Sequence, residues 1–127
     1  MPTNTPQEMM DTFFERFSAH DIEAVLALYE PNAVFVDEPG KVVQGTDAIR
    51  ESLTAFMAMK PDLKLVKHVT LAAGDVETNY VKWTLTGTGP DGEPISMEGA
   101  AVDVIRRQPD GTWKFVIDNP WGVAILD

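Results

Sequence analysis

The second half of the chain constrains the fold most, because hydrophobic residues there recur at every second position between short turn sequences. A period of two places successive side chains on opposite faces of a β-strand. The turn sequences at residues 73–75, 90–92 and 109–111 each contain glycine and aspartate, and they divide this half into four segments. Strands joined by such turns pair as hairpins, so the chain from Leu63 to Asn119 is predicted to form a four-stranded antiparallel meander.

The first half contains three predicted helices, in which apolar residues recur at spacings of three and four. Thr5 is expected to cap the first helix, Asp21 the second, which stops before Pro31, and Thr46 the third. A short strand, residues 33–36, lies between the second and third helices. The predicted fold is therefore α+β, with two or three helices packed on a curved antiparallel sheet that encloses a largely apolar pocket.

The length and composition fit a single domain spanning residues 1–127. Hydrophobic residues make up 44% of the 127 residues and charged residues 24%, close to the averages of globular proteins. The chain contains neither an internal repeat nor a low-complexity linker. A second domain is therefore not expected.

The charge and the residue types narrow the possible partners and chemistry. The net charge of −10 repels phosphate and anionic lipid, so neither a nucleic acid nor a membrane partner is expected. The absence of cysteine excludes disulfides, thiolate metal sites and thiol nucleophiles. Two isolated histidines, His20 and His68, do not make a metal site, and we predict no metal and no cofactor. The N-terminus lacks the features of a signal peptide, which favours a cytoplasmic protein.

Asp103 lies on the same predicted strand face as Met97, Gly99, Ala101 and Ile105. A carboxylate among apolar side chains must be neutral, paired or exposed, because an unpaired buried charge is too costly. Asp103 is thus a candidate site residue. The alternative is a strand residue that is solvated at an edge or hydrogen-bonded to a neighbouring chain.

Asp37 is a second candidate, at the end of the first predicted strand and before a Glu-Pro-Gly turn. Carboxylates on loops that a rigid scaffold positions often act as general bases. The alternative reading is an aspartate that only forms the turn.

Several aromatic residues are candidates for the wall of a pocket. Trp83, Phe115 and Trp121 can line such a wall, although aromatic residues on inward strand faces are more often core. Strand alternation gives Ile117 and Asn119 the same inward parity as Phe115. The side-chain amide of Asn119 is therefore expected to face the pocket as a hydrogen-bond donor.

Three stretches of the chain resemble the nuclear-transport-factor-2-like superfamily, in its ketosteroid isomerase and polyketide cyclase (SnoaL-like) branch. They are residues 21–29 (DIEAVLALY) with 32–35 (NAVF), residues 44–51 (QGTDAIRE), and the closing hairpin through Trp113 and Trp121. The resemblance spans nearly the whole chain and implies a cone-shaped sheet wrapped around the N-terminal helices. These segments are typical of the fold, which hosts many different reactions.

The resemblance implies roles for three residues. Asp37 falls where ketosteroid isomerases keep the carboxylate that moves a proton. Asp103 falls where those enzymes keep the protonated aspartic acid of the oxyanion hole. Phe13 falls where those enzymes have a tyrosine, and a phenylalanine cannot donate a hydrogen bond. This departure weakens a prediction of steroid isomerisation in particular.

Two hypotheses of function follow. In the first, the protein is an isomerase or cyclase that acts on a small apolar carbonyl compound, with Asp37 as base and Asp103 as protonated donor. The pocket residues are then Phe13, Trp83, Phe115, Ile117, Asn119 and Trp121. In the second, the protein is a non-catalytic ligand-binding or accessory domain, because the acid–base set is incomplete at Phe13.

The outer face of the predicted meander is also unusually apolar. Val66, Tyr80, Val102, Val104 and Val116 share the parity that points away from the helices. A face of this kind needs a cover, and a second copy of the same face would supply one. We therefore expect a homodimer.

Overall fold

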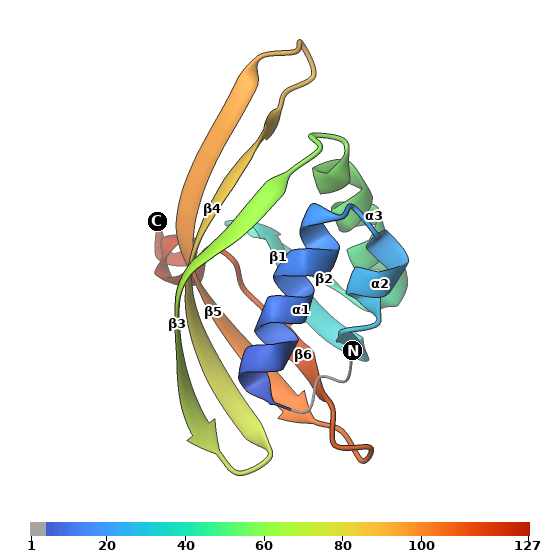
Figure 1. The fold of residues 1–127 in the computed structure, drawn as a ribbon, viewed down its shortest axis with the longest axis vertical. Helices are drawn as coiled ribbons and strands as arrows, with labels where there is room; N and C mark the ends of the chain where they lie inside the picture. The colour runs from blue at the N-terminus through green and yellow to red at the C-terminus, as the bar shows by residue number, and fades with distance from the viewer. Residues whose placement is uncertain (1–4) are drawn as a thin grey trace.

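The computed structural model describes residues 5–127, which form a six-stranded sheet with the N-terminal helices on one face and the short C-terminal helix on the opposite side (Figure 1). The helices are α1 (Pro6–Ser18), α2 (Ile22–Leu26), α3 (Thr46–Met57) and a final 3₁₀ helix η1 (Gly122–Leu126). The strands are β1 (Tyr29–Glu38), β2 (Lys41–Gln44), β3 (Asp62–Ala73), β4 (Val76–Thr88), β5 (Pro94–Arg107) and β6 (Trp113–Asp118). The predicted α+β class is confirmed, and no described helix has both the length and the apolar character to cross a membrane.

The strand order in the sheet is β2-β1-β6-β5-β4-β3. The meander from β3 to β6 is antiparallel throughout, as predicted, whereas β1 pairs with β6 in parallel. The hairpin partner β2 was not predicted, and it pairs with β1 through the turn after Glu38. Parallel partners are distant in sequence, so alternation within either strand could not identify the β1–β6 pair.

The helix boundaries follow local capping chemistry at two of three sites. The Thr5 hydroxyl accepts a hydrogen bond from the Glu8 N–H, and the Asp21 carboxylate accepts one from the Ala24 N–H, as predicted. The prediction for Thr46 was wrong, because Gly45 is the N-cap, with φ +91° and no side-chain hydrogen bond. Helix α2 also ends earlier than predicted, so that Tyr29 begins β1 instead of completing the helix.

The core lies between α1, α3 and the inner face of the sheet. Aromatic rings meet at its centre, with Phe13 against Phe115 at 5.2 Å in an edge-to-face contact and Tyr29 against Phe115 at 4.9 Å. Ile49 and Leu53 of α3 are fully buried on the same side. Burying such large apolar side chains supplies the main favourable term of folding.

Two irregularities reverse the alternation that the sequence predicts. The β3–β4 register shifts between Leu65 and Lys67, so Val69 and Leu71 are exposed and His68 lies on the inner face. Simple alternation along the predicted strand would place Val69 and Leu71 on the face of Leu65 and His68 on the outer face, so the sequence-based prediction is wrong for all three residues. One additional residue in a strand exchanges its inner and outer faces beyond that point.

The second irregularity lies in β6, where the β5–β6 register shifts between Val104 and Ile105. Phe115 points inward as predicted, but Ile117 is 37% exposed and Asp118 is buried instead. The inward position predicted for Ile117 was wrong for this reason. This shift places a carboxylate in the interior that simple alternation would have pointed outward.

Candidate functional site

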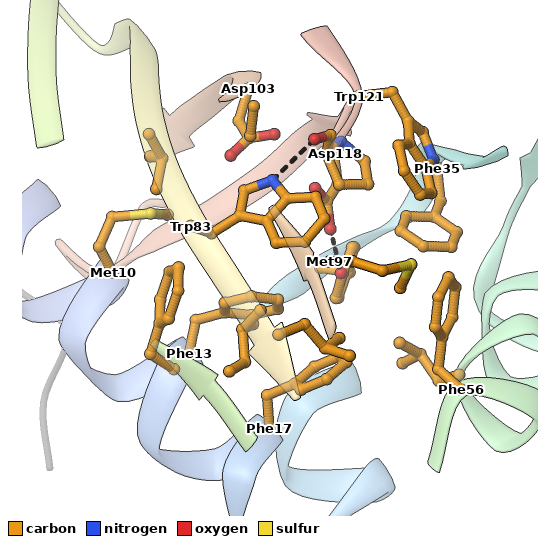
Figure 2. Close-up of a pocket in the computed structure, with 18 residues that line it drawn as sticks. Met10, Phe13, Phe17, Phe35, Phe56, Trp83, Met97, Asp103, Asp118 and Trp121 are labelled. Atoms are coloured by element: carbon orange, nitrogen blue, oxygen red, sulfur yellow. Dashed lines mark hydrogen bonds between the residues drawn. The ribbon is translucent and has the colours of Figure 1, made fainter. Parts of the chain in front are cut away.

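An enclosed pocket lies between the helices and the inner face of the sheet, with a cavity volume of about 60 Å³. Its lining is almost wholly apolar and aromatic, with contributions from α1, β1, α3, all four strands of the meander and the segment after β6 (Figure 2). Phe13, Trp83 and Trp121 lie in this lining, as the sequence predicts. Phe115 is fully buried in the core and does not line the cavity, and neither do Ile117 and Asn119.

Three polar side chains form one group in the pocket wall. Tyr29 comes from the start of β1, Asp103 from β5 and Asp118 from the end of β6, and all three are at most 5% exposed. The Tyr29 hydroxyl donates to Asp118 Oδ2 at 2.5 Å, and the Asn119 main-chain N–H donates to Asp103 Oδ1 at 2.9 Å. Asp103 and Asp118 are close enough for each carboxyl group to shift the pKa of the other. In Figure 2 both carboxyl groups lie beside the Trp83 ring.

Burial sets the protonation of this group. The pKa of Asp103 is raised well above its ordinary value of 3.8, first by desolvation and then by the negative charge of Asp118. The pKa of Asp118 is raised by desolvation, against which the hydrogen bonds from Tyr29 and Asp103 act. The pKa of Tyr29 is raised well above 10.0, again mainly by burial. Two adjacent buried carboxyls cannot both ionise easily, so Asp103 holds the proton and Asp118 is the carboxylate.

The arrangement provides an acid and a base next to each other in an apolar pocket. A neutral carboxylic acid donates a hydrogen bond to an oxygen atom, and a carboxylate accepts a proton. Both groups act more strongly in a dry pocket than in water, because the low polarity strengthens their electrostatic interactions. The pocket can thus stabilise negative charge on a ligand oxygen and move a proton.

Asp37 does not line the enclosed pocket. It lines an open hollow of about 440 Å³ beside it, together with Glu38 and Pro39. Its side chain is 17% exposed and forms an ion pair with Lys41 at 3.3 Å. Its main-chain oxygen accepts a hydrogen bond from Trp121 Nε1 at 3.1 Å. Asp37 and Asp103, which the sequence assigns to one site, therefore line two adjoining spaces.

The side chains of Phe56, Met97 and Trp121 line both the enclosed pocket and the hollow. They form the partition between the two spaces. Trp121 packs edge-to-face on Trp83 with ring centroids 5.9 Å apart. The partition is therefore built from α3, β5 and the segment that follows β6.

The Trp83 ring lies directly on the backbone of β5. Trp83 Nε1 donates to the Pro120 main-chain oxygen at 2.8 Å. A Cβ atom at Gly99 would lie 2.6 Å from the ring, closer than side chains tolerate. Glycine at this position thus makes room for the indole that covers the two carboxyl groups.

A second polar group occupies the inner face further along the sheet. His68 Nε2 is 2.8 Å from Asn79 Oδ1, and His68 Nδ1 is 3.2 Å from Gln7 Oε1 on α1. Asn79 is fully buried and is the cross-strand partner of Asp103. These residues do not line the pocket, although Asn79 supports the strand next to it.

The structure brings together two residues that sequence reasoning missed. Asp118 was overlooked because the β6 irregularity reverses its parity, and Tyr29 because it was assigned to a helix. Asn119 was expected to donate its amide into the pocket, but Nδ2 donates to the Gly122 oxygen and Oδ1 accepts from the Trp121 N–H. A signal for Tyr29 was nevertheless present, because the next residue, Glu30, directly precedes Pro31, and the residue before a proline disfavours the helical conformation.

Among residues 5–127, no group of three or more histidine, cysteine or acidic side chains is arranged to hold a metal ion. The polar groups of the pocket are instead a phenol and two carboxyls, which suit hydrogen bonding and proton transfer.

A family model described as SnoaL-like domain matches residues 10–116. A search of the curated proteins finds no match. Among solved structures, a nuclear transport factor 2-like superfamily protein from Salmonella enterica aligns with a TM-score of 0.80 at 20% identity, covering 91% of this chain and 86% of the other. A proposed aromatic ring hydroxylase from Novosphingobium aromaticivorans aligns with a TM-score of 0.79 at 24% identity, covering 88% and 82%.

A proposed dehydratase of the same superfamily from Streptomyces avermitilis aligns with a TM-score of 0.73 at 21% identity, covering 90% of this chain and 95% of the other. Identities in this range establish a shared fold and carry no assignment of reaction. The sequence resemblance to the superfamily and to its SnoaL-like branch is thereby confirmed.

Proposed function

Because this chain belongs to the SnoaL-like domain family, whose fold encloses a pocket, we propose that it binds a small apolar molecule with one carbonyl oxygen and catalyses proton transfer on it. Asp103 donates a hydrogen bond to the carbonyl oxygen, and Asp118 accepts a proton from the adjacent carbon. An isomerase or cyclase is the reaction class that such a step serves. The proposal rests on one observation, the buried Asp103–Asp118 pair in an apolar pocket.

The proposed step balances as follows. The Asp118 carboxylate removes a proton from the carbon next to the carbonyl, and the electron pair of that C–H bond forms an enolate. The negative charge develops on the oxygen that Asp103 contacts, so the hydrogen bond strengthens in the transition state. Asp118 then returns the proton to the same carbon or to another, and the latter outcome isomerises the substrate.

Tyr29 supports this division of roles. Its hydroxyl donates to Asp118 Oδ2, which stabilises the carboxylate form in an environment that otherwise disfavours a charge. The Asn119 N–H, which donates to Asp103 Oδ1, fixes the orientation of the acid. Tyr29 thus acts on the proposed base and does not replace the oxyanion donor that is missing at Phe13.

The test is deuterium exchange into 2-tetralone, a bicyclic ketone with acidic protons next to the carbonyl, followed by NMR in D₂O. The wild-type protein should accelerate exchange over buffer alone. Asp118→Asn should lower the rate on the order of 10²–10⁴-fold, the usual contribution of a general base. Asp103→Asn should lower it less, because an amide still donates a hydrogen bond.

Asp37→Asn is the discriminating variant, since the family resemblance assigns the base to Asp37. A rate within twofold of wild type supports Asp118 as the base. A loss for Asp37→Asn that exceeds the loss for Asp118→Asn would transfer that role to Asp37. If Asp37 is the base, the substrate must reach from the pocket, where Asp103 lies, into the hollow, where Asp37 lies.

A second candidate function is ligand binding without catalysis. It is favoured by the fact that each carboxyl group already accepts a hydrogen bond from the protein, Asp118 from the Tyr29 hydroxyl and Asp103 from the Asn119 N–H, as in a purely structural group. In that case 2-tetralone binds, but the wild-type protein and Asp118→Asn exchange its protons at the same rate. That result would overturn the catalytic proposal.

A further inference from the structure

The enclosed pocket is too small, as it stands, for the ligands that its lining favours. Its cavity volume is about 60 Å³, whereas an apolar protein cavity that takes up a benzene ring has a volume of about 150 Å³. An aromatic ligand must therefore displace at least one side chain. Protein interiors are closely packed, so a side chain can only move toward free space.

The free space lies on the far side of the partition. The hollow measures about 440 Å³, and Phe56, Met97 and Trp121 separate it from the pocket. Among the described lining residues, these three alone are shared by both spaces. A ligand that reaches the carboxyl pair from the hollow must pass at least one of them.

Trp121 is the least free of the three. Its indole Nε1 donates to the Asp37 main-chain oxygen, and its ring packs edge-to-face on Trp83. Trp83 is in turn fixed by its hydrogen bond to Pro120. Moving Trp121 would break a hydrogen bond and an aromatic contact together.

Met97 and Phe56 have fewer constraints. Met97 is half-buried, is unbranched and has three rotatable side-chain bonds, which lets it adopt alternative positions at low cost. Phe56 is also half-buried, and the aromatic neighbour of its ring is Phe35, at a centroid distance of 6.3 Å. In Figure 2 the side chains of both residues lie on the side of the pocket opposite Met10.

We propose that Met97, with Phe56 beside it, is the specificity-determining residue of the pocket: it swings into the hollow to admit a neutral two-ring aromatic ligand that carries one oxygen. One ring then lies near Asp103 and Asp118 in the pocket enlarged by the movement of Met97, and the other extends into the hollow. The inference rests on the proposed function only in its binding step.

The ligand is assigned as neutral because of the charges along its path. Asp37 and Glu38 line the hollow, and the net charge of the chain is −10. The ionised member of the carboxyl pair adds a further negative charge inside. Lys41 offsets the charge of Asp37, but none of the described Lys and Arg residues lines either space, so Glu38 and the carboxyl pair disfavour an anionic ligand.

The test follows the binding of 2-naphthol by stopped-flow quenching of tryptophan emission, since Trp83 and Trp121 both line the pocket. Met97→Ala should raise the association rate constant on the order of tenfold, which corresponds to about 1.4 kcal/mol of barrier. Met57→Ala is the matched control, because Met57 is a half-buried methionine of α3 that lines neither the pocket nor the hollow. Its association rate should stay within twofold of wild type.

Met97→Leu keeps the proposal testable if Met97→Ala fails to fold. Leucine has about the same volume as methionine, so this substitution usually costs little stability. Its shorter, branched side chain should slow association severalfold relative to wild type. ¹³C-methyl NMR of the methionines should show a large shift for Met97 on binding of 2-naphthol and a small one for Met57, which lines neither space. Equal rates for Met97→Ala, Met97→Leu and wild type, or an unshifted Met97 methyl group, would overturn the proposal.

The two proposals fail separately. If 2-tetralone exchange is absent but Met97→Ala accelerates 2-naphthol binding, the protein is a binding domain with the partition described here. If exchange depends on Asp118 while wild type, Met97→Ala and Met97→Leu bind 2-naphthol at the same rate, the catalytic proposal stands. The role proposed for Met97 is then wrong.

Discussion

At the scale of single residues, the protein keeps two carboxyl groups where carboxyl groups are costly. Asp103 and Asp118 are 3% and 5% exposed and are surrounded by apolar side chains. Sharing one proton removes one of the two charges, and the bonds from Tyr29 and the Asn119 N–H offset part of the remaining cost. Such a group lowers stability, and its retention is consistent with a role in the chemistry of the pocket.

The raised pKa of Asp103 predicts a characteristic pH dependence of stability. Between the pKa values of its unfolded and folded states, the folded protein holds a proton that the unfolded chain has lost. This carboxyl therefore lowers the free energy of unfolding as the pH rises above about 4, by up to about 1.4 kcal/mol per pH unit. The stabilisation is fully present below the unfolded pKa and disappears as the pH rises through the folded pKa.

Asp103→Asn removes this titration, so its stability relative to wild type should increase from pH 4 to pH 8. Urea unfolding at several pH values measures the difference. Asp91→Asn, in the exposed turn between β4 and β5, is the control and should show a flat difference. A flat difference for Asp103→Asn as well would mean that Asp103 is ionised in the folded protein.

At the scale of elements, the segment after β6 connects the carboxyl pair to the aromatic wall. The Asn119 main chain donates to Asp103 and accepts from the Val102 N–H, while its side chain bonds Trp121 and Gly122. Trp121 in turn reaches β1 through the Asp37 oxygen. One short segment thus positions both the acid and the partition.

Asn119→Ala should therefore loosen this segment while leaving its main-chain bond to Asp103. The loss of two side-chain hydrogen bonds should lower the free energy of unfolding by about 1–2 kcal/mol. Near-UV circular dichroism should weaken as Trp121 becomes less ordered. Asn32→Ala, at an exposed position of β1, is the control, and equal effects of the two substitutions would contradict the positioning role of Asn119.

At the scale of the whole molecule, the outer face of the sheet carries apolar side chains without a cover. Val66 is 60% exposed, Val69 46%, Leu71 57%, Tyr80 44% and Ile117 37%. The sequence predicts this face from Val66 and Tyr80, whereas Val69, Leu71 and Ile117 join it because of the two strand irregularities. Contiguous apolar surface of this kind marks an interaction site.

The predicted homodimer remains the proposal for this face. Sedimentation at micromolar concentration should give about twice the chain mass of 14.0 kDa, since an isologous contact covers the same face on both copies. Tyr80→Lys should shift the protein toward monomer, because it places a charge in the contact. A wild-type protein that sediments as a monomer would show that the outer face tolerates water.

The amino-acid sequence alone determined the features that depend on local interactions. The helices and the meander follow from side-chain period, the turns from glycine, proline and aspartate, and two of three helix caps from single residues. The sequence also predicted the family resemblance and the inward position of Asp103. It predicted three of the pocket residues as well, namely Phe13, Trp83 and Trp121. The structure agrees with these predictions because each feature depends on neighbours within one element or on a pattern that spans the whole chain.

Only the tertiary structure decided which residues meet in the pocket. The register shifts in β3 and β6 depend on how each strand pairs with its neighbour, and one shift exchanges the faces of every later residue. For this reason Asp118 replaced Ile117 on the inner face. Tyr29 joined the site because β1 pairs with β6, and Asp37 lies in the hollow because β1 turns away into β2 there. Such pairings join residues up to 89 positions apart, a distance over which local periodicity carries no information.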